Sequence, residues 1–89
     1  MKPTYARILG QVARSRRVLL GIDLSAMAAE MKMSRSGWSR IETGDTTMTV
    51  EQLARAASVL GVAPWSLVQK ADEYVTWCEE PKPKPKGKP

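Results

Sequence analysis

Apolar residues recur at helical spacing in five stretches of the chain, separated by short polar segments that contain glycine or a helix-capping residue. The first stretch covers residues 4–20 and ends at Gly21. The apolar face of this stretch is formed by Leu9, Ala13 and Leu20. Arg17 falls on the same face, so it must reach solvent or pair with a carboxylate, because an unpaired buried charge is strongly destabilising.

Two short helices are predicted next, on either side of a tight turn. Asp23 is a typical N-cap for a helix over residues 24–31. Ser34 has the same role for a helix over residues 35–43, which Gly44 ends. The residues expected to face inward from this pair are Met27, Ala28, Met31, Trp38 and Ile41. Helices this short bury little between themselves, so we expect the pair to pack on the first helix and on the part of the chain after Gly44.

Two more helices complete the pattern. Thr49 and Gln52 have the spacing of a capping box and begin a fourth helix, which ends at Gly61. The inward residues of this helix are predicted to be Val50, Leu53, Ala57 and Leu60. Pro64 suits the first position of a fifth helix over residues 64–79. The apolar residues of the fifth helix cover more than one face, and they are Leu67, Val68, Ala71, Tyr74, Val75, Trp77 and Cys78. This width indicates a second contact surface.

The composition favours one small domain. A chain of 89 residues with 43% hydrophobic residues can close a single modest core. We therefore predict an all-α, compact five-helix domain over residues 1–80. Residues 81–89 alternate lysine with proline or glycine, so they have nothing to bury and are predicted to be a disordered tail.

Several function classes are disfavoured by residues that the chain lacks. One cysteine and no histidine leave no intramolecular disulfide and no metal-ligand cluster. The sequence also has no nucleophile with a base, no paired carboxylates and no phosphate-binding glycine loop, so no catalytic residue, cofactor or small-molecule ligand is expected. No apolar run approaches the roughly 20 residues that span a bilayer. We expect a cytoplasmic, nucleoid-associated protein that is not an enzyme.

Positive charge is concentrated in two parts of the chain. Residues 1–42 carry eight basic and three acidic side chains, a net charge of +5. Residues 43–80 carry two basic and six acidic side chains, a net charge of −4, and residues 81–89 carry four lysines. This asymmetry is typical of a protein that presents one face to a polyanion.

Residues 23–44 resemble the helix-turn-helix of the lambda-repressor and Cro-like family, also called the XRE family. The resemblance covers about 60 of the 89 residues, from Leu9-Gly10 to Leu60-Gly61-Val62. Its most specific part is the run Ser39-Arg40-Ile41-Glu42, followed one residue later by Gly44. The resemblance implies a domain that binds double-stranded DNA with residues 34–43 in the major groove. It also implies an ion pair between Arg17 and Glu42 that holds this helix in place.

The outer side of the third predicted helix carries the expected base contacts. These residues are Arg35, Ser36, Gly37, Ser39 and Arg40. An arginine can bind guanine through two hydrogen bonds, and serines are short donors or acceptors. Phosphate contacts are expected from residues around this helix, namely Lys32, Ser34, Thr43, Thr46 and Thr47. Asp23 and Leu24 depart from the family's pattern of a neutral cap followed by glutamine, which weakens the usual phosphate anchor at that end.

Two hypotheses of different class fit these features. The first is a homodimeric transcriptional repressor of phage, plasmid or bacterial type that binds an inverted repeat, with its own promoter as one candidate target. Its dimer interface is predicted on the fifth helix, at Leu67, Ala71, Tyr74, Trp77 and Cys78. The second is a protein-interaction module, such as an antitoxin or adaptor, built on the same scaffold. The two outward arginines favour DNA, and the wide apolar fifth helix favours a protein contact.

Overall fold

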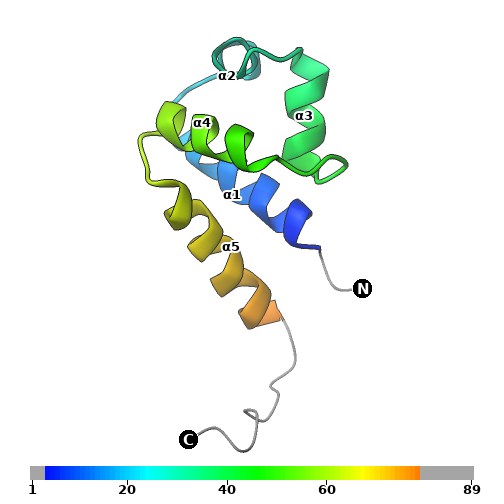
Figure 1. The fold of residues 1–89 in the computed structure, drawn as a ribbon, viewed down its shortest axis with the longest axis vertical. Helices are drawn as coiled ribbons and strands as arrows, with labels where there is room; N and C mark the ends of the chain where they lie inside the picture. Colours follow the sequence, from blue (N-terminus) through cyan, green and yellow to red (C-terminus); the bar gives the residue numbers. More distant parts are fainter. Residues whose placement is uncertain (1–3, 79–89) are drawn as a thin grey trace, which may run out of the picture.

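The computed structural model describes residues 4–78, which form five α-helices and no strand (Figure 1). In chain order the helices are α1 (Tyr5–Leu19), α2 (Leu24–Met31), α3 (Arg35–Thr43), α4 (Val50–Leu60) and α5 (Pro64–Cys78). The all-α prediction is confirmed, and the bounds of α2 and α3 are those expected. The last residue predicted for the fifth helix and the whole lysine-proline segment lie outside the described residues.

Side chains at the helix starts explain these bounds. The side-chain oxygens of Thr4, Asp23 and Ser34 each accept a hydrogen bond from the backbone N–H three residues further on. Each such bond satisfies one of the N–H groups that a helix start leaves without a partner. Thr49 and Gln52 form a complete capping box, with hydrogen bonds of 2.9 and 3.0 Å.

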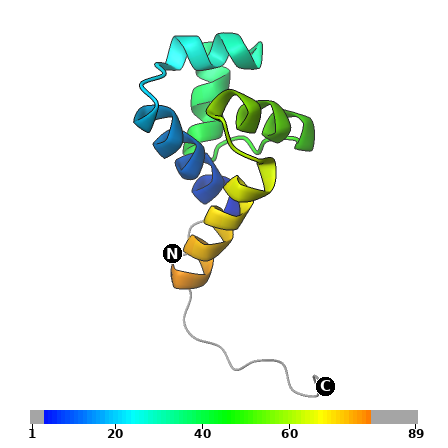
Figure 2. The same cartoon turned by 90° about the vertical axis from the view of Figure 1, so that its left-hand side faces the viewer.

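Helix α1 is the element on which the other helices assemble, because it packs against α3, α4 and α5. The short helix α2 packs against α3 and α4. In both views α2 and α3 lie at one end of the molecule and α5 extends toward the other (Figures 1 and 2). The helix-turn-helix and the fifth helix are therefore held apart.

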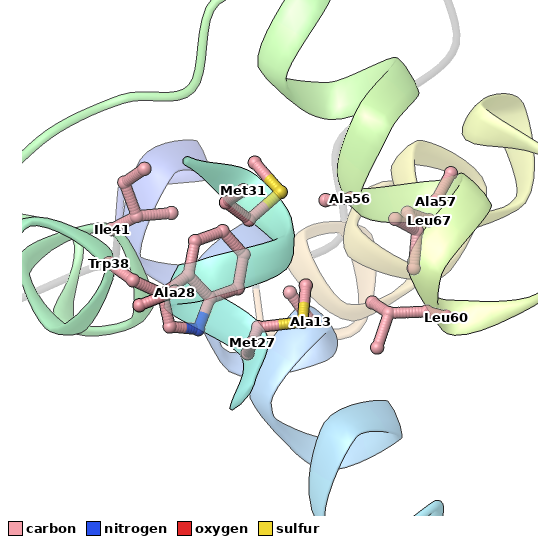
Figure 3. Close-up of a cluster of buried hydrophobic side chains, with 10 residues drawn as sticks. All are labelled: Ala13, Met27, Ala28, Met31, Trp38, Ile41, Ala56, Ala57, Leu60 and Leu67. Carbon is pink, nitrogen blue, oxygen red and sulfur yellow. The ribbon is translucent and has the colours of Figure 1, made fainter. Parts of the chain in front are cut away.

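The core lies where these helices converge. Figure 3 shows Met27 and Met31 of α2 between Trp38 and Ile41 on one side and the residues of α4 on the other. The buried cluster consists of Ala13, Met27, Ala28, Met31, Trp38, Ile41, Ala56, Ala57, Leu60 and Leu67. All five residues predicted to face inward from the helix pair are buried.

Two apolar residues expected to face inward do not. Leu20 is 44% exposed and Val50 is 82% exposed. Leu20 is the C-cap of α1, beyond its last helical residue, and Val50 is the first residue of α4, so both lie at helix ends. Ile8 and Ala56 are buried in those helices instead. The predicted faces of α1 and α4 therefore reach the core along their length but not at these two helix ends.

Close contact between α1 and α3 is made through Gly10, which is buried. A Cβ atom built there would overlap the backbone carbonyl oxygens of Ile41 and Glu42. The backbone of α1 therefore touches the C-terminal turn of α3 with no side chain between them. This contact leaves little freedom in the distance between the two helices.

Candidate nucleic-acid interface

Helix α3 has one buried side and one outward side. Trp38 and Ile41 are almost fully buried, with exposed fractions of 0% and 1%. Arg35, Ser36 and Arg40 are exposed. The outward side thus presents two guanidinium groups and a hydroxyl group, as required for hydrogen bonds with base edges.

The other two predicted base-contacting residues, Gly37 and Ser39, are half-buried. The N–H of Gly37 donates to the Oγ of its N-cap, Ser34, over 3.0 Å. A Cβ atom at Gly37 would lie 3.0 Å from that same Oγ. Packing against the cap therefore gives a local reason for a small residue at this position.

The buried side of α3 is held by Glu42. The Nε and Nη2 atoms of Arg17 donate to Oε2 and Oε1 of Glu42 over 2.6 and 3.1 Å. The indole Nε1 of Trp38 donates to the same Oε2 over 2.6 Å. Only 7% of Arg17 and 6% of Glu42 are exposed, so this is a buried, two-pronged ion pair between α1 and α3.

Arg17 also reaches the segment between α1 and α2, because its Nη1 donates to the carbonyl oxygen of Ile22 over 2.8 Å. The hydrogen bond with Glu42 raises the pKa of Arg17 above the ordinary arginine value, against the opposing effect of burial. Arg17 therefore stays charged at every pH near neutrality. The guanidinium of Arg17, on α1, therefore binds both the segment before α2 and the end of α3.

The expected phosphate contacts surround the two ends of α3. Lys32, Ser34, Thr43, Thr46 and Thr47 are all exposed. Lys32 has the left-handed backbone expected of a turn residue, with φ of 57°. The hydroxyl of Thr43 and the backbone N–H of Thr46 both donate to the carbonyl oxygen of Arg40, each over 3.1 Å. These bonds anchor the loop after α3.

The start of α2 is a poor position for a phosphate in this chain. The carboxylate of Asp23 accepts a hydrogen bond of 2.7 Å from the N–H of Ala26. A negative charge therefore already occupies the positive end of the α2 dipole. A weaker phosphate anchor at this end stays a prediction, and the capping carboxylate is a physical reason for it.

Sequence reasoning missed two contacts, one within α3 and one between α1 and α4. The bond from Trp38 to Glu42 spans four residues, and helical i, i+4 spacing is the signal that could have revealed it. The Nε of Arg16 donates to the carbonyl oxygen of Leu60 over 3.1 Å, at the C-terminus of α4. No local pattern indicates that bond, because it joins residues 44 positions apart.

The predicted dimer residues of the fifth helix fall into three groups. Leu67 and Ala71 are 3% and 0% exposed and lie inside the protomer. Tyr74 is 53% exposed. The side chains of Trp77 and Cys78 lie outside the described residues. The exposed apolar surface of α5 also includes Trp65, at 66%, which was not among the residues predicted to form this interface.

The described part of the chain holds neither a cluster of metal ligands nor a membrane-spanning helix. Residues 4–78 contain no group of three potential metal ligands from histidine, cysteine, aspartate and glutamate. Within the same range, no helix combines the length and hydropathy of a membrane span.

Comparisons with known proteins bear on the family and the fold of the chain. A family model described as a helix-turn-helix domain matches residues 8–68. A crystal structure of the clp gene regulator ClgR from Corynebacterium glutamicum is similar, with a TM-score of 0.81 and 25% identity over 86% of this chain and 82% of that chain. A second ClgR structure from C. glutamicum has a TM-score of 0.78 and 26% identity over 82% of this chain and 94% of that chain. No curated protein matches the sequence.

Proposed function

The chain belongs to the helix-turn-helix domain family, and we propose that it is a homodimeric transcriptional repressor that reads an inverted-repeat DNA operator with α3. The coarser part of this function, a DNA-binding transcription regulator, rests on the family and on the likeness to the gene regulator ClgR. Repression, dimerisation and the roles of single residues are our proposals. Repression would follow from occlusion of a promoter, with the protein's own promoter as one candidate target.

The observation that carries the proposal is the contrast between the two sides of α3. Arg35 and Arg40 are exposed on the side away from the core. The opposite side is held in place by the buried contacts of Glu42. A rigid helix with outward arginines can place each guanidinium against the O6 and N7 atoms of a guanine in the major groove.

Phosphate contacts would then set the register of α3 on the duplex. Lys32 and Ser34 flank its N-terminus, and Thr46 and Thr47 lie in the loop after its C-terminus. The carboxylate of Asp23 repels a phosphate from the start of α2. We therefore assign more of the sequence-independent affinity to the loop after Gly44 than the family's pattern implies.

Replacing Arg35 with alanine tests the base-reading role. We expect a loss of about 1–3 kcal/mol in binding to the preferred operator, together with relaxed specificity at one base position. The operator would be obtained by selecting bound fragments from random duplex DNA, and affinities measured by titration at fixed salt. Arg55→Ala is the matched control, because Arg55 is an exposed arginine on α4, outside the proposed interface.

Two results would contradict this assignment. One is an equal loss for Arg35→Ala on the selected operator and on random DNA, which would make Arg35 a phosphate contact. The other is a selection that enriches no sequence, which would favour the protein-interaction module over the repressor.

The dimer is proposed to form through exposed apolar residues of α5. Trp65 is 66% exposed and Val68 is 39% exposed. Their i, i+3 spacing places them on one helix face. Exposed aromatic side chains of this kind often contribute most to the energy of a protein interface. A two-fold dimer would place two copies of α3 on half-sites about 34 Å apart.

We expect the full chain to have the mass of a dimer by light scattering, and Trp65→Ala to shift it toward the monomer. Because Trp65 is exposed, the substitution should leave the fold of the protomer intact. Val50→Ala is the control, since Val50 is the more exposed apolar residue and lies on α4. A wild-type protein that stays monomeric on operator DNA would refute the dimer.

A further inference from the structure

A groove of about 800 Å³ lies between α1 and α5. Its apolar lining includes Ile8, Val12, Val62 and Leu67. Leu19 and Tyr74 also line it, and their exposed fractions are 74% and 53%. The groove therefore has buried apolar side chains at its base and exposed ones, Leu19 and Tyr74, at its rim.

The charged side chains that line this α1/α5 groove all have one sign. They are Arg7, Arg16 and Lys70, and the described residues that line the groove include no aspartate or glutamate. Arg7 and Lys70 are exposed, whereas Arg16 is half-buried and held by its hydrogen bond to the carbonyl oxygen of Leu60. An occupant with negative charge beside apolar groups would satisfy both parts of this surface.

The groove is separate from the proposed DNA-reading helix. Its lining comes from α1, from Val62 and from α5, with no residue from α2 or α3. In Figures 1 and 2, α5 extends away from the end of the molecule that carries α2 and α3. An occupant of the groove would therefore not cover the residues proposed to contact bases.

We propose that the α1/α5 groove binds an acidic amphipathic α-helix of a partner protein. Along α1 the lining runs from Arg7 to Leu19, a rise of about 18 Å. A partner helix of about 12 residues spans that length. Apolar side chains at positions i, i+3 or i+4 and i+7 of the partner helix would contact the apolar lining of the groove. Carboxylates beside them on the partner helix would form ion pairs with Arg7 and Lys70.

Charge disfavours two other occupants. Two copies of this chain placed groove to groove would bring Arg7 and Lys70 of both protomers together, and like charges repel across an interface. Residues 81–89 of the same chain contain four lysines and no acidic residue, so their charge matches that of the groove instead of opposing it. A partner with clustered carboxylates fits better than either.

The test uses the full chain and a fluorescently labelled synthetic helical peptide, with leucines at the anchor spacing and glutamates beside them. A second peptide has lysine in place of each glutamate. Fluorescence anisotropy should show saturable binding of the acidic peptide and binding at least about 10-fold weaker for the basic one.

Two variants place the peptide in the groove. Lys70→Glu should weaken binding of the acidic peptide by about 10-fold, whereas Arg55→Glu, the same charge reversal on α4, should leave it near wild type. Leu19→Ser should weaken binding of the acidic peptide at unchanged charge. Lys70, Leu19 and Arg55 are exposed, so their folding can be checked by circular dichroism. The Lys70→Glu and Arg55→Glu variants should have the same affinity for operator DNA.

Several outcomes overturn the proposal. One is no saturable binding of the acidic peptide, and another is equal weakening by Lys70→Glu and Arg55→Glu. A third is conversion of a dimer to a monomer by Lys70→Glu or Leu19→Ser, which would make the groove an interface between copies. The last is Lys70-dependent binding of the fatty acid decanoate without binding of the peptide, which would make it a small-ligand site.

Discussion

Replacing Glu42 with glutamine should lower the free energy of unfolding by about 3–5 kcal/mol. The substitution keeps the size of the side chain but removes its charge. It leaves the guanidinium of Arg17, which is only 7% exposed, buried without a compensating carboxylate. The substitution also replaces the carboxylate with an amide. In the wild-type protein the Oε2 atom of this carboxylate accepts hydrogen bonds from both Arg17 and Trp38. Chemical denaturation of the two proteins measures the difference.

The control for this substitution is Glu30→Gln, the same change at an exposed position on α2. It should stay within about 0.5 kcal/mol of wild type, as most surface substitutions do. The double variant Arg17→Met with Glu42→Gln should be more stable than Glu42→Gln alone, because it removes the uncompensated charge. If the loss of unfolding free energy in the double variant equals the sum of the losses from Arg17→Met and Glu42→Gln alone, the ion pair contributes nothing beyond its separate side chains.

The pH dependence of this effect follows from the raised pKa of Arg17, whose main cause is the hydrogen bond with Glu42. A group with a raised folded-state pKa contributes stability that is fully present below its unfolded-state pKa and is lost as the pH rises through its folded-state pKa. For an arginine that loss begins only at strongly alkaline pH, above the ordinary arginine pKa. The titration of Arg17 should therefore leave the deficit of Glu42→Gln unchanged across neutral and mildly alkaline pH.

Replacing Gly44 with alanine should lower the free energy of unfolding by about 2–5 kcal/mol, for two separate reasons. Gly44 has φ of 87°, in the left-handed region, where a Cβ atom costs roughly 1–2 kcal/mol. That Cβ would also lie 2.5 Å from the Cα of Arg7 and 2.9 Å from its backbone nitrogen. The first turn of α1 would have to move, which adds about 1–3 kcal/mol of overpacking.

Gly61→Ala separates these two reasons. Gly61 has φ of 73°, so an alanine there has the same backbone strain, but its Cβ meets no heavy atom within 4 Å. We expect a loss of about 1–2 kcal/mol for Gly61→Ala and a larger one for Gly44→Ala, both measured by chemical denaturation. Equal losses would mean that α1 does not restrict the end of α3 through this contact.

Both predictions concern the same structural requirement. Glu42 and Gly44 lie at the C-terminal end of α3, and they contact opposite ends of α1, its last turn and its first turn. Gly10 adds a third contact between the same two helices. The orientation of the proposed recognition helix is thus determined by α1, which itself carries none of the proposed base contacts.

Local chemistry in the sequence was enough to determine the helices. The N-caps at Asp23, Ser34 and Thr49 act on backbone groups three residues away, so neighbouring residues alone specify where the helices begin. The two sides of α3 were predictable for the same reason, because Trp38 and Arg40 differ in polarity and the helical period separates them. The helix-turn-helix and its outward arginines were therefore readable from the chain.

Tertiary structure decided which surfaces the helices share. Val50, the first residue of α4, is exposed, whereas Ala56 is buried where α4 packs against α1, α2 and α5. Leu67 and Ala71 were predicted to form a dimer surface, yet they lie in the protomer because α1 covers that side of α5. The α1/α5 groove also depends on residues far apart in the sequence, such as Arg7 and Lys70. Such contacts arise only when separate helices pack, so their geometry requires the folded chain.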